Sequence, residues 1–245
     1  MHENEDSLLG GKVRLLQKRG GYRTAIDPVF LAAAVPAKEG EAVLDLGCGV
    51  GAVSLCLHTR ISGLNITGLD VQKPLVDLAR RNSVLNNCED NIRFVDGDLL
   101  KPLKELSEAK FDHVLANPPY FTAKSGNTSP DTTKALANVE NEAGLAEWVG
   151  AACRALKTRG RITFIHRTDR VADLITILND SFGGLVIFPL WTARGKEAKR
   201  VIVTARKGVA SPTRISSGLV LHKKDGSFTN QAQGVLKNAA PLNVT

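Results

Sequence analysis

Four consecutive residues, Asn117-Pro118-Pro119-Tyr120, carry groups that can bind an amino group on a planar ring or amide. The side-chain oxygen of Asn117 and the carbonyl of Pro118 can both accept hydrogen bonds from an NH₂ group. Such bonds draw a delocalised, weakly nucleophilic nitrogen towards tetrahedral geometry and expose its lone pair. The two prolines fix the backbone φ angles, and Tyr120 offers an aromatic face on which a flipped base can stack.

A second motif alternates glycines behind an acid, in the segment Asp45-Leu-Gly-Cys-Gly-Val-Gly51 that follows a short apolar run. Glycines there allow a tight turn and let a ligand approach the backbone. Asp70 stands twenty-one residues after Gly49, and a carboxylate there can accept both hydroxyls of a ribose. Asp98 follows a third run and is placed to accept from an adenine amino group. We therefore predict a nucleoside-containing ligand at the glycine turn, with Asp70 and Asp98 as its acceptors.

The spacing of these glycines is not the GxGxxG fingerprint of dinucleotide-binding proteins. It resembles the DxGxGxG motif of Rossmann-like methyltransferases that use S-adenosylmethionine (SAM), and the segment at 117–120 resembles the (D/N/S)PP(Y/F/W) motif of amino-methyltransferases. This resemblance implies in-line transfer of the SAM methyl group, with proximity and orientation as the main contributions. No strong base is needed, because the nitrogen becomes acidic as it is methylated. Adenine, cytosine, guanine and glutamine amides all remain open as acceptors.

Three further stretches narrow the resemblance, namely residues 17–31 (QKRGGYRTAIDPVFL), 194–207 (RGKEAKRVIVTARK) and 219–226 (LVLHKKDG). With NPPYF, they make the chain similar to the bacterial tRNA(Val) (adenine-37-N6)-methyltransferase family from about residue 8 to about residue 230. The resemblance implies SAM as the cofactor and a tRNA adenine beside the anticodon as the acceptor. It implies that SAM is bound by Asp45, Gly47, Gly49, Gly51, Asp70 and Asp98. It also implies that Asn117, Pro118, Pro119 and Tyr120 form the catalytic site.

The same resemblance implies a class I α/β fold, with a seven-stranded, mainly parallel sheet whose last two strands form an antiparallel hairpin. We divide the chain into an N-terminal extension over the cofactor site, residues 1–40, and a methyltransferase domain, residues 41–245. Within the extension, Arg23 is a candidate partner for the SAM carboxylate. Pairing of Arg23 with a surface acid is an equally good interpretation.

Positive charge is concentrated in the second half of the chain. Residues 1–122 carry a net charge of −2 and residues 123–245 carry +9, which favours a polyanionic partner such as nucleic acid or, alternatively, a solvated basic surface. Four cations, Arg194, Lys196, Lys199 and Arg200, fall in the predicted hairpin loop. They can bind RNA phosphates, or they can form a solvated hairpin tip.

Composition excludes several other classes of protein. The 245 residues suffice for one α/β domain with appendages, and no apolar run is long enough for a transmembrane helix. The acidic start lacks the apolar region of a signal peptide. The four cysteines show no CxxC spacing, so neither a zinc site nor a disulfide framework is indicated. We expect a cytoplasmic protein with reduced thiols and no metal.

Alternating apolar runs and amphipathic segments predict an open sheet with helices on both faces. Residues 8–16 are expected to form one or two short strands, and the polar segment 122–141 is expected to be a loop that closes over the acceptor base. Asp27 and Thr168 are expected to cap helices. Core strands are predicted at 42–46, 65–69, 92–95, 111–116, 161–166, 185–188 and 200–204, and helices at 27–35, 50–60, 74–86, 145–156 and 169–179.

Other functions remain open on the sequence alone. A glutamine-amide methyltransferase acting on a translation factor shares both motifs, although such enzymes usually carry a separate helical N-terminal domain. An adenine methyltransferase acting on ribosomal RNA or DNA needs the same site, although a DNA enzyme usually needs a sizeable recognition domain. A non-catalytic RNA-binding module with a degenerate methyltransferase fold is disfavoured, because both motifs are intact. The sequence does not indicate an oligomeric state.

Overall fold

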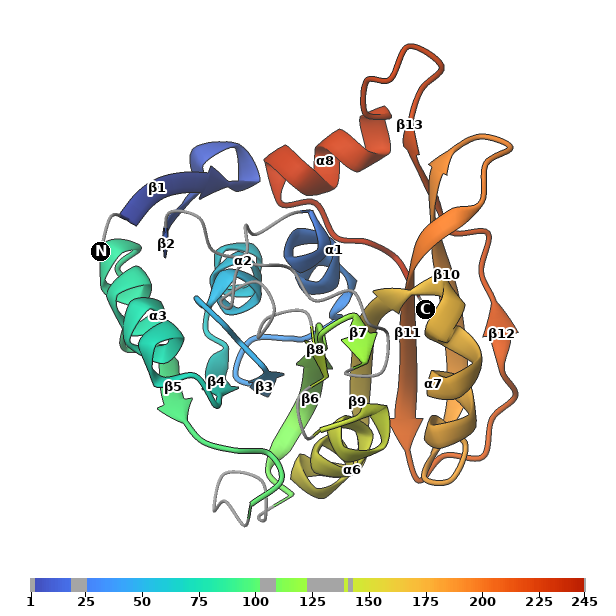
Figure 1. Ribbon diagram of the computed structural model, residues 1–245, viewed down its shortest axis with the longest axis horizontal. Coiled ribbons are helices and arrows are strands. Elements are labelled where there is room, and N and C mark those ends of the chain that lie inside the picture. The colour runs from blue at the N-terminus through green and yellow to red at the C-terminus, as the bar shows by residue number, and fades with distance from the viewer. Residues whose placement is uncertain (1–2, 19–25, 102–108, 123–138, 141–142, 245) are drawn as a thin grey trace.

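A computed structural model describes residues 3–18, 26–101, 109–122, 139–140 and 143–244 of the chain (Figure 1). The strands are β1 (Glu3–Leu8), β2 (Val13–Lys18), β3 (Ala42–Leu46), β4 (Asn65–Asp70), β5 (Ile92–Asp96), β6 (Phe111–Ala116), β7 (Phe121–Thr122), β8 (Val139–Glu140), β9 (Leu156–Arg167), β10 (Phe182–Ala193), β11 (Ala198–Lys207), β12 (Arg214–Ile215) and β13 (Leu219–His222). The helices are α1 (Asp27–Ala34), α2 (Ala52–Arg60), α3 (Lys73–Leu85), α6 (Leu145–Ala155), α7 (Val171–Leu178) and α8 (Asn230–Asn238), with 3₁₀ turns η1 (Leu9–Gly11) and η3 (Thr168–Arg170).

The central sheet has the order β12-β10-β11-β9-β6-β3-β4-β5, and β13 also pairs with β10. The pairs among β5, β4, β3, β6 and β9 are parallel, whereas β11 is antiparallel to both β9 and β10. The predicted parallel sheet with a C-terminal antiparallel hairpin is therefore confirmed. Within the described residues the sheet has nine strands rather than seven, because the short strands β12 and β13 extend it beside β10.

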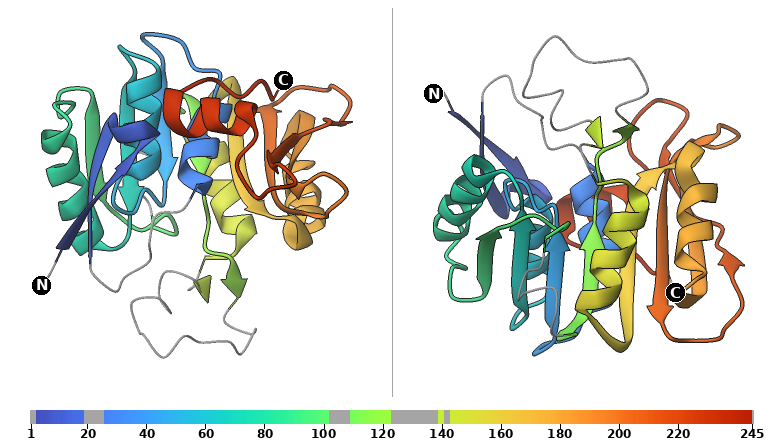
Figure 2. Two further views of the ribbon diagram at one scale, coloured as in Figure 1. Left: turned by 90° about the horizontal axis from the view of Figure 1, so that it is seen from above. Right: turned by 60° about the horizontal axis from the view of Figure 1, so that its bottom comes forward.

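Side chains alternate between two hydrophobic cores, one on each face of the sheet. Val43 and Leu115 lie in the core under α1, α2, α3 and α8, whereas their neighbours Leu44 and Val114 lie in the core under α6 and α7. Figure 2 shows these two helical layers on either side of the strands. Because both faces are covered, ligands have access to the sheet at its strand ends.

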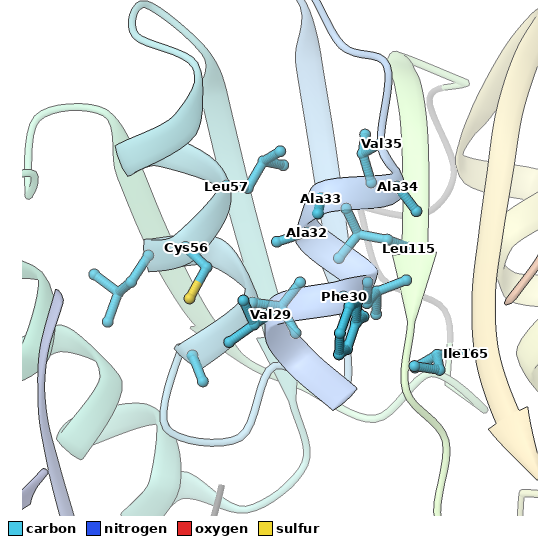
Figure 3. Packing of buried hydrophobic residues seen from close by; sticks show 14 of the residues in the cluster. Val29, Phe30, Ala32, Ala33, Ala34, Val35, Cys56, Leu57, Leu115 and Ile165 are labelled. Carbon is cyan, nitrogen blue, oxygen red and sulfur yellow. The ribbon is translucent and has the colours of Figure 1, made fainter. Parts of the chain in front are cut away.

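Helix α1 is buried in the first core. Phe30 and Leu31 are fully buried, and Figure 3 shows α1 between Cys56 of α2 and Leu115 of β6. The predicted capping role of its first residue is wrong: Ile26, with helical φ and ψ, precedes the helix, and Asp27 is already its first helical residue. The carboxylate of Asp27 instead points to groups on other elements, described below.

The first two strands form an antiparallel hairpin. One or two short strands were predicted at residues 8–16, and the observed pair extends beyond that range at both ends. It is attached to α3 by asparagine side chains. Asn82 accepts from the Leu16 N–H at 2.8 Å and donates to the Leu16 carbonyl at 3.1 Å, and Asn86 makes the matching pair with Arg14. The N-terminal extension is thus joined to the sheet domain by specific hydrogen bonds.

Two features of the C-terminal half differ from the sequence predictions. Thr168 does not cap α7, because its hydroxyl donates to the carbonyl of Ala198 at 2.7 Å. Helix α8 was not predicted; Thr229 caps it by accepting from the Ala232 N–H, and the helix packs against α1 and η1. None of the described helices is long and apolar enough to cross a membrane.

Candidate active site

The glycine turn joins β3 to α2 at the carboxyl edge of the sheet. Gly47 has φ +68°, and a Cβ there would lie 2.5 Å from the Trp148 ring, so no larger residue fits. Gly49 has φ +54°, but nothing lies within 4 Å of its Cβ position. The turn is therefore closed on the Trp148 side and open at Gly49, where a ligand can approach the backbone.

Asp70 ends the neighbouring strand β4 and is bonded to the glycine turn. Its Oδ2 accepts from the Gly49 N–H at 2.9 Å, and its Oδ1 accepts from the Gln72 N–H at 2.8 Å. Burial raises the pKa of Asp70, and the two backbone donors oppose that rise. Each carboxylate oxygen retains a lone pair, which fits the predicted contact with ribose hydroxyls.

Asp98 lies just beyond β5, the next strand along the same edge. Its Oδ1 accepts from the Leu100 N–H at 3.0 Å, and Lys101 Nζ lies 3.5 Å from its Oδ2. The neighbouring Gly97 N–H donates to the Asp70 carbonyl at 3.0 Å. The structure therefore brings Asp98, Asp70 and the glycine turn together at one edge, as a nucleoside site requires.

Asp45 lies beneath the turn rather than at its surface. It is fully buried, its Oδ2 accepts from the Ser54 hydroxyl at 2.7 Å, and its Oδ1 has no partner among the described residues. Contact between Asp45 and the cofactor stays a prediction. Ser54, which sequence reasoning missed, follows the glycines by one helical turn and binds this carboxylate from inside α2.

Burial raises the pKa of Asp45 to about 7, far above the value of about 3.9 in an unfolded chain. The folded state thus holds this proton more tightly, so the contribution of Asp45 to stability is present below about pH 4 and is lost as the pH rises to about 7. The Asp45→Asn variant has no such proton. Its Tm relative to the wild-type Tm is expected to increase by a few degrees between pH 5 and pH 8. Thermal melting tests this, and a pH-independent difference would contradict it.

The predicted catalytic motif begins directly beyond β6, which is the neighbour of β3 on the side opposite β4. Leu46 pairs with Ala116, so Asn117 follows β6 at the level where Gly47 follows β3. Strand β3 lies between β4 and β6, and the strand order reverses between β3 and β6. In open α/β sheets, ligands bind at the carboxyl ends of the strands beside such a reversal. The sheet register therefore places the predicted NH₂-binding motif beside the glycine turn.

Within this motif, the Tyr120 hydroxyl reaches two acceptors from different elements. Its oxygen lies 2.5 Å from Asp27 Oδ2 on α1 and 2.9 Å from Asn117 Oδ1. Arg200 of β11 pairs with the same Asp27 oxygen at 2.9 Å, and its guanidinium carbon lies 4.5 Å from the centre of the Tyr120 ring. His166 of β9 completes the cluster, with its ring edge-to-face against Tyr120 at 5.4 Å.

His166 is fully buried, and its ring is fixed in one neutral form. Burial lowers its pKa to about 4, and its Nδ1 accepts from the Arg167 N–H at 2.9 Å, so Nε2 carries the proton. A neutral imidazole with Nδ1 already bonded is not a base for the reacting nitrogen. The sequence analysis did not predict Asp27 or His166 as site residues. The features that could have indicated them are an acid directly before Pro28 and a histidine at the end of a predicted strand.

The four predicted RNA-binding cations separate into two groups. Arg194, Lys196 and Lys199 are exposed at the β10–β11 hairpin tip, which lies at the carboxyl edge because Arg200 pairs with Arg167 at the end of β9. The prediction for Arg200 requires correction. Both Lys199 and Arg200 lie in β11 rather than in the loop, and the Arg200 side chain turns inward to Asp27 and Tyr120.

Further positive charge adjoins the hairpin tip. Strand β13 runs beside β10 so that His222 pairs with Ala193, and Lys223 follows directly. Lys223 and Lys224 are both exposed, and they extend the positive charge of the hairpin tip. Trp191 anchors the hairpin, since its indole N–H donates to the Ser217 carbonyl at 2.9 Å. Arg23 and most of the 122–141 loop lie outside the described residues, so their predicted roles stay predictions.

Comparisons with known proteins agree with this geometry. The sequence profile of the methyltransferase small domain family matches residues 24–188. The chain is 26% identical to the tRNA1(Val) (adenine(37)-N6)-methyltransferase of Aeromonas salmonicida over 216 residues, which cover 87% of this chain and 88% of that protein. It is 30% identical to the protein of the same name from Porphyromonas gingivalis over 191 residues, 76% of this chain and 74% of that protein.

A similar fold has been solved. The structure of a predicted O-methyltransferase from Agrobacterium tumefaciens matches with a TM-score of 0.74 at 24% identity, covering 89% of this chain and 98% of that one. At this identity the likeness supports the fold alone. Assignment to a family rests instead on the sequence profile and on the named relatives.

Proposed function

The chain belongs to the methyltransferase small domain family, and from this we propose that it transfers a methyl group from SAM to the N6 amino group of an adenine in tRNA. The acceptor we propose is adenine 37 of a valine tRNA, as in the names of the relatives from A. salmonicida and P. gingivalis. The observation that carries the proposal is the pairing of Leu46 with Ala116. This register supports the proposal because it brings Asn117 beside the glycine turn that follows β3.

The residues at this edge fit SAM. Asp70 can accept from the ribose hydroxyls, Asp98 can accept from the adenine amino group of the cofactor, and the open side of Gly49 leaves room for a ligand near the backbone. When bound, SAM supplies an electrophilic methyl group on a sulfonium. The chain's task is then to present the acceptor nitrogen in line with that methyl.

Asn117 and Pro118 perform this task by accepting hydrogen bonds from the amino group of the base. Pro118 is buried at the end of β6, which fixes its carbonyl relative to the sheet. The Tyr120 ring, held by Arg200 and His166, can stack against the base. The proton leaves the nitrogen without a dedicated base, in agreement with a neutral His166 whose Nε2 already carries a proton.

The hairpin tip supports RNA as the acceptor. Arg194, Lys196 and Lys199 are exposed at the same sheet edge as Asn117, and Lys223 and Lys224 adjoin them. Phosphate contacts position a nucleic acid without reading its sequence. The tip can therefore hold the RNA backbone while the motif after β6 binds the flipped base.

We expect the double variant Arg194→Ala/Lys196→Ala to weaken tRNA binding and to reduce the slope of log K against log salt by about 2, one for each lost phosphate contact. The matched control is Lys38→Ala, an exposed lysine before β3 at the opposite edge of the sheet. Binding titrations over a range of salt concentrations measure the slope. An unchanged slope in the double variant, or an equal change in the control, would contradict this role.

Substrate class is tested by supplying labelled SAM with unmodified tRNA, ribosomal RNA, DNA or a release-factor protein in parallel. The proposal predicts label in tRNA, recovered as N6-methyladenosine after digestion to nucleosides. Label in the release factor would instead assign the site to glutamine amides. Label in ribosomal RNA or DNA would keep the adenine chemistry and overturn the tRNA assignment.

A further inference from the structure

One phenol proton faces two acceptor oxygens in the site. The Tyr120 oxygen is 2.5 Å from Asp27 Oδ2 and 2.9 Å from Asn117 Oδ1. A hydroxyl has a single proton to donate, so it cannot serve both oxygens at once. The choice of acceptor for the Tyr120 proton matters. In the proposed mechanism, Asn117 Oδ1 must accept a hydrogen bond from the amino group of the base.

Asp27 is the stronger competitor for this proton. Its side chain is 6% exposed, and it is ion-paired with Arg200 at 2.9 Å. Hydrogen bonds to a carboxylate are shorter and stronger than those to a neutral amide oxygen, and the shorter of the two contacts is the one to Asp27. The Tyr120 hydroxyl therefore donates its hydrogen bond to Asp27. The lone pairs of Asn117 Oδ1 then stay available to the substrate.

We propose that the Asp27–Arg200 ion pair is a positioning device that withholds the Tyr120 proton from Asn117, so that Asn117 can accept from the substrate amino group. Asp27 acts through Tyr120 and need not touch the substrate. Arg200 keeps the carboxylate in place and lies against the Tyr120 ring at 4.5 Å. This inference rests on the proposed function, since it concerns the acceptor group in the same reaction.

The proposal requires three distant parts of the chain to meet. Asp27 comes from the first turn of α1, Tyr120 from the loop after β6, and Arg200 from β11. Burial of α1 in the first hydrophobic core fixes the position of Asp27, and the pairing of Arg200 with Arg167 fixes β11 against β9. The rigid core thereby sets the distance between the carboxylate and the phenol.

The test is a rescue experiment with single and double variants. In Asp27→Asn the charged acceptor is replaced by a neutral amide oxygen no stronger than Asn117 Oδ1, and Arg200 still faces that oxygen. The phenol then donates to Asn117 as well and competes with the substrate. We expect kcat to fall about tenfold or more, the effect of one competing hydrogen bond, with the Kd for SAM within about twofold of wild type. Removing the competing proton, in Asp27→Asn/Tyr120→Phe, should raise kcat above that of Asp27→Asn, although Tyr120→Phe causes a loss of its own in the wild-type background.

Three controls make the result specific. In Arg200→Lys the carboxylate remains, so adding Tyr120→Phe should lower kcat further rather than restore it. Asp173→Asn breaks the ion pair between Asp173 of α7 and Arg170 of η3 and should leave kcat unchanged. Asp27→Ser removes the carboxylate with a smaller side chain and replaces Asp27→Asn if thermal melting shows that variant unfolded.

A double variant no more active than Asp27→Asn, or an Asp27→Asn enzyme with wild-type kcat, would overturn the proposal. A change confined to KM for RNA would also overturn it, because the competition acts on the bound acceptor. Failure of the wild-type enzyme to methylate any RNA counts against the proposed function instead. The two failures are therefore distinguishable in one set of measurements.

Discussion

Replacing Asn117 with alanine is expected to lower kcat about 100- to 1,000-fold, the usual loss when a preorganised hydrogen-bonding group is removed from the reacting centre. The Kd for SAM should stay within about twofold, because Asn117 follows β6 and is placed to touch the acceptor rather than the cofactor. Single-turnover kinetics give the first quantity, and calorimetric titration with SAM gives the second.

Two further variants sharpen this test. Asn117→Asp retains an acceptor oxygen and should keep more activity than Asn117→Ala. Asn65→Ala removes an exposed asparagine at the start of β4, at the opposite edge of the sheet, and should behave as wild type. If Asn117→Ala kept wild-type kcat, the acceptor role of the motif would be wrong.

The second large effect is expected at Asp70. In Asp70→Ala the bond from the Gly49 N–H is lost together with the proposed ribose contacts. SAM binding should then weaken by about 1–3 kcal/mol, the cost of leaving such hydrogen bonds unmade. This is a rise in Kd of roughly 5- to 150-fold. At saturating SAM, kcat should change much less, because Asp70 has no contact with the acceptor.

Asp96→Ala is the matched control for Asp70→Ala. Asp96 pairs with Asp70 in the register of β4 and β5, but it is exposed and its ion pair is with Arg80 of α3. Its loss should leave the Kd for SAM near the wild-type value. Equal losses of SAM affinity in Asp70→Ala and Asn117→Ala would show that the two motifs do not divide cofactor and acceptor between them.

The main architecture and both site motifs were predictable from the sequence because local patterns determine them. Short apolar runs predicted β3, β4, β5 and β6, and the residues that could do chemistry follow these runs directly. Parallel strands bring their carboxyl ends to one edge. The meeting of the glycine turn, Asp70, Asp98 and Asn117 therefore followed once the strands were placed.

The Tyr120 cluster could not be predicted, because it depends on long-range packing. Nothing near Asp27 in the sequence indicates that its carboxylate faces Tyr120 and Arg200 across the fold. Its position before Pro28 is typical of a helix cap, and the ion pair outcompetes that local role. Only the packing of α1 against β6 and β9 brings these groups together.

Arg200 shows why a run of cations is hard to assign from sequence. Successive residues of a strand point to opposite sides, so Lys199 is exposed while its neighbour Arg200 turns to the site. The sequence analysis counted both among the cations of the hairpin loop, although the strand predicted at 200–204 already began at Arg200. The strand begins at Ala198, and that small shift separates a phosphate-binding candidate from a positioning residue.

The decisive measurement of the proposed activity is transfer of labelled methyl from SAM to two unmodified valine tRNA transcripts, one with adenine and one with guanine at position 37. We expect N6-methyladenosine in the adenine transcript, no label in the guanine transcript, and no transfer with Asn117→Ala. Equal label in the two transcripts, or none in either beside a labelled release factor, would contradict the proposed activity.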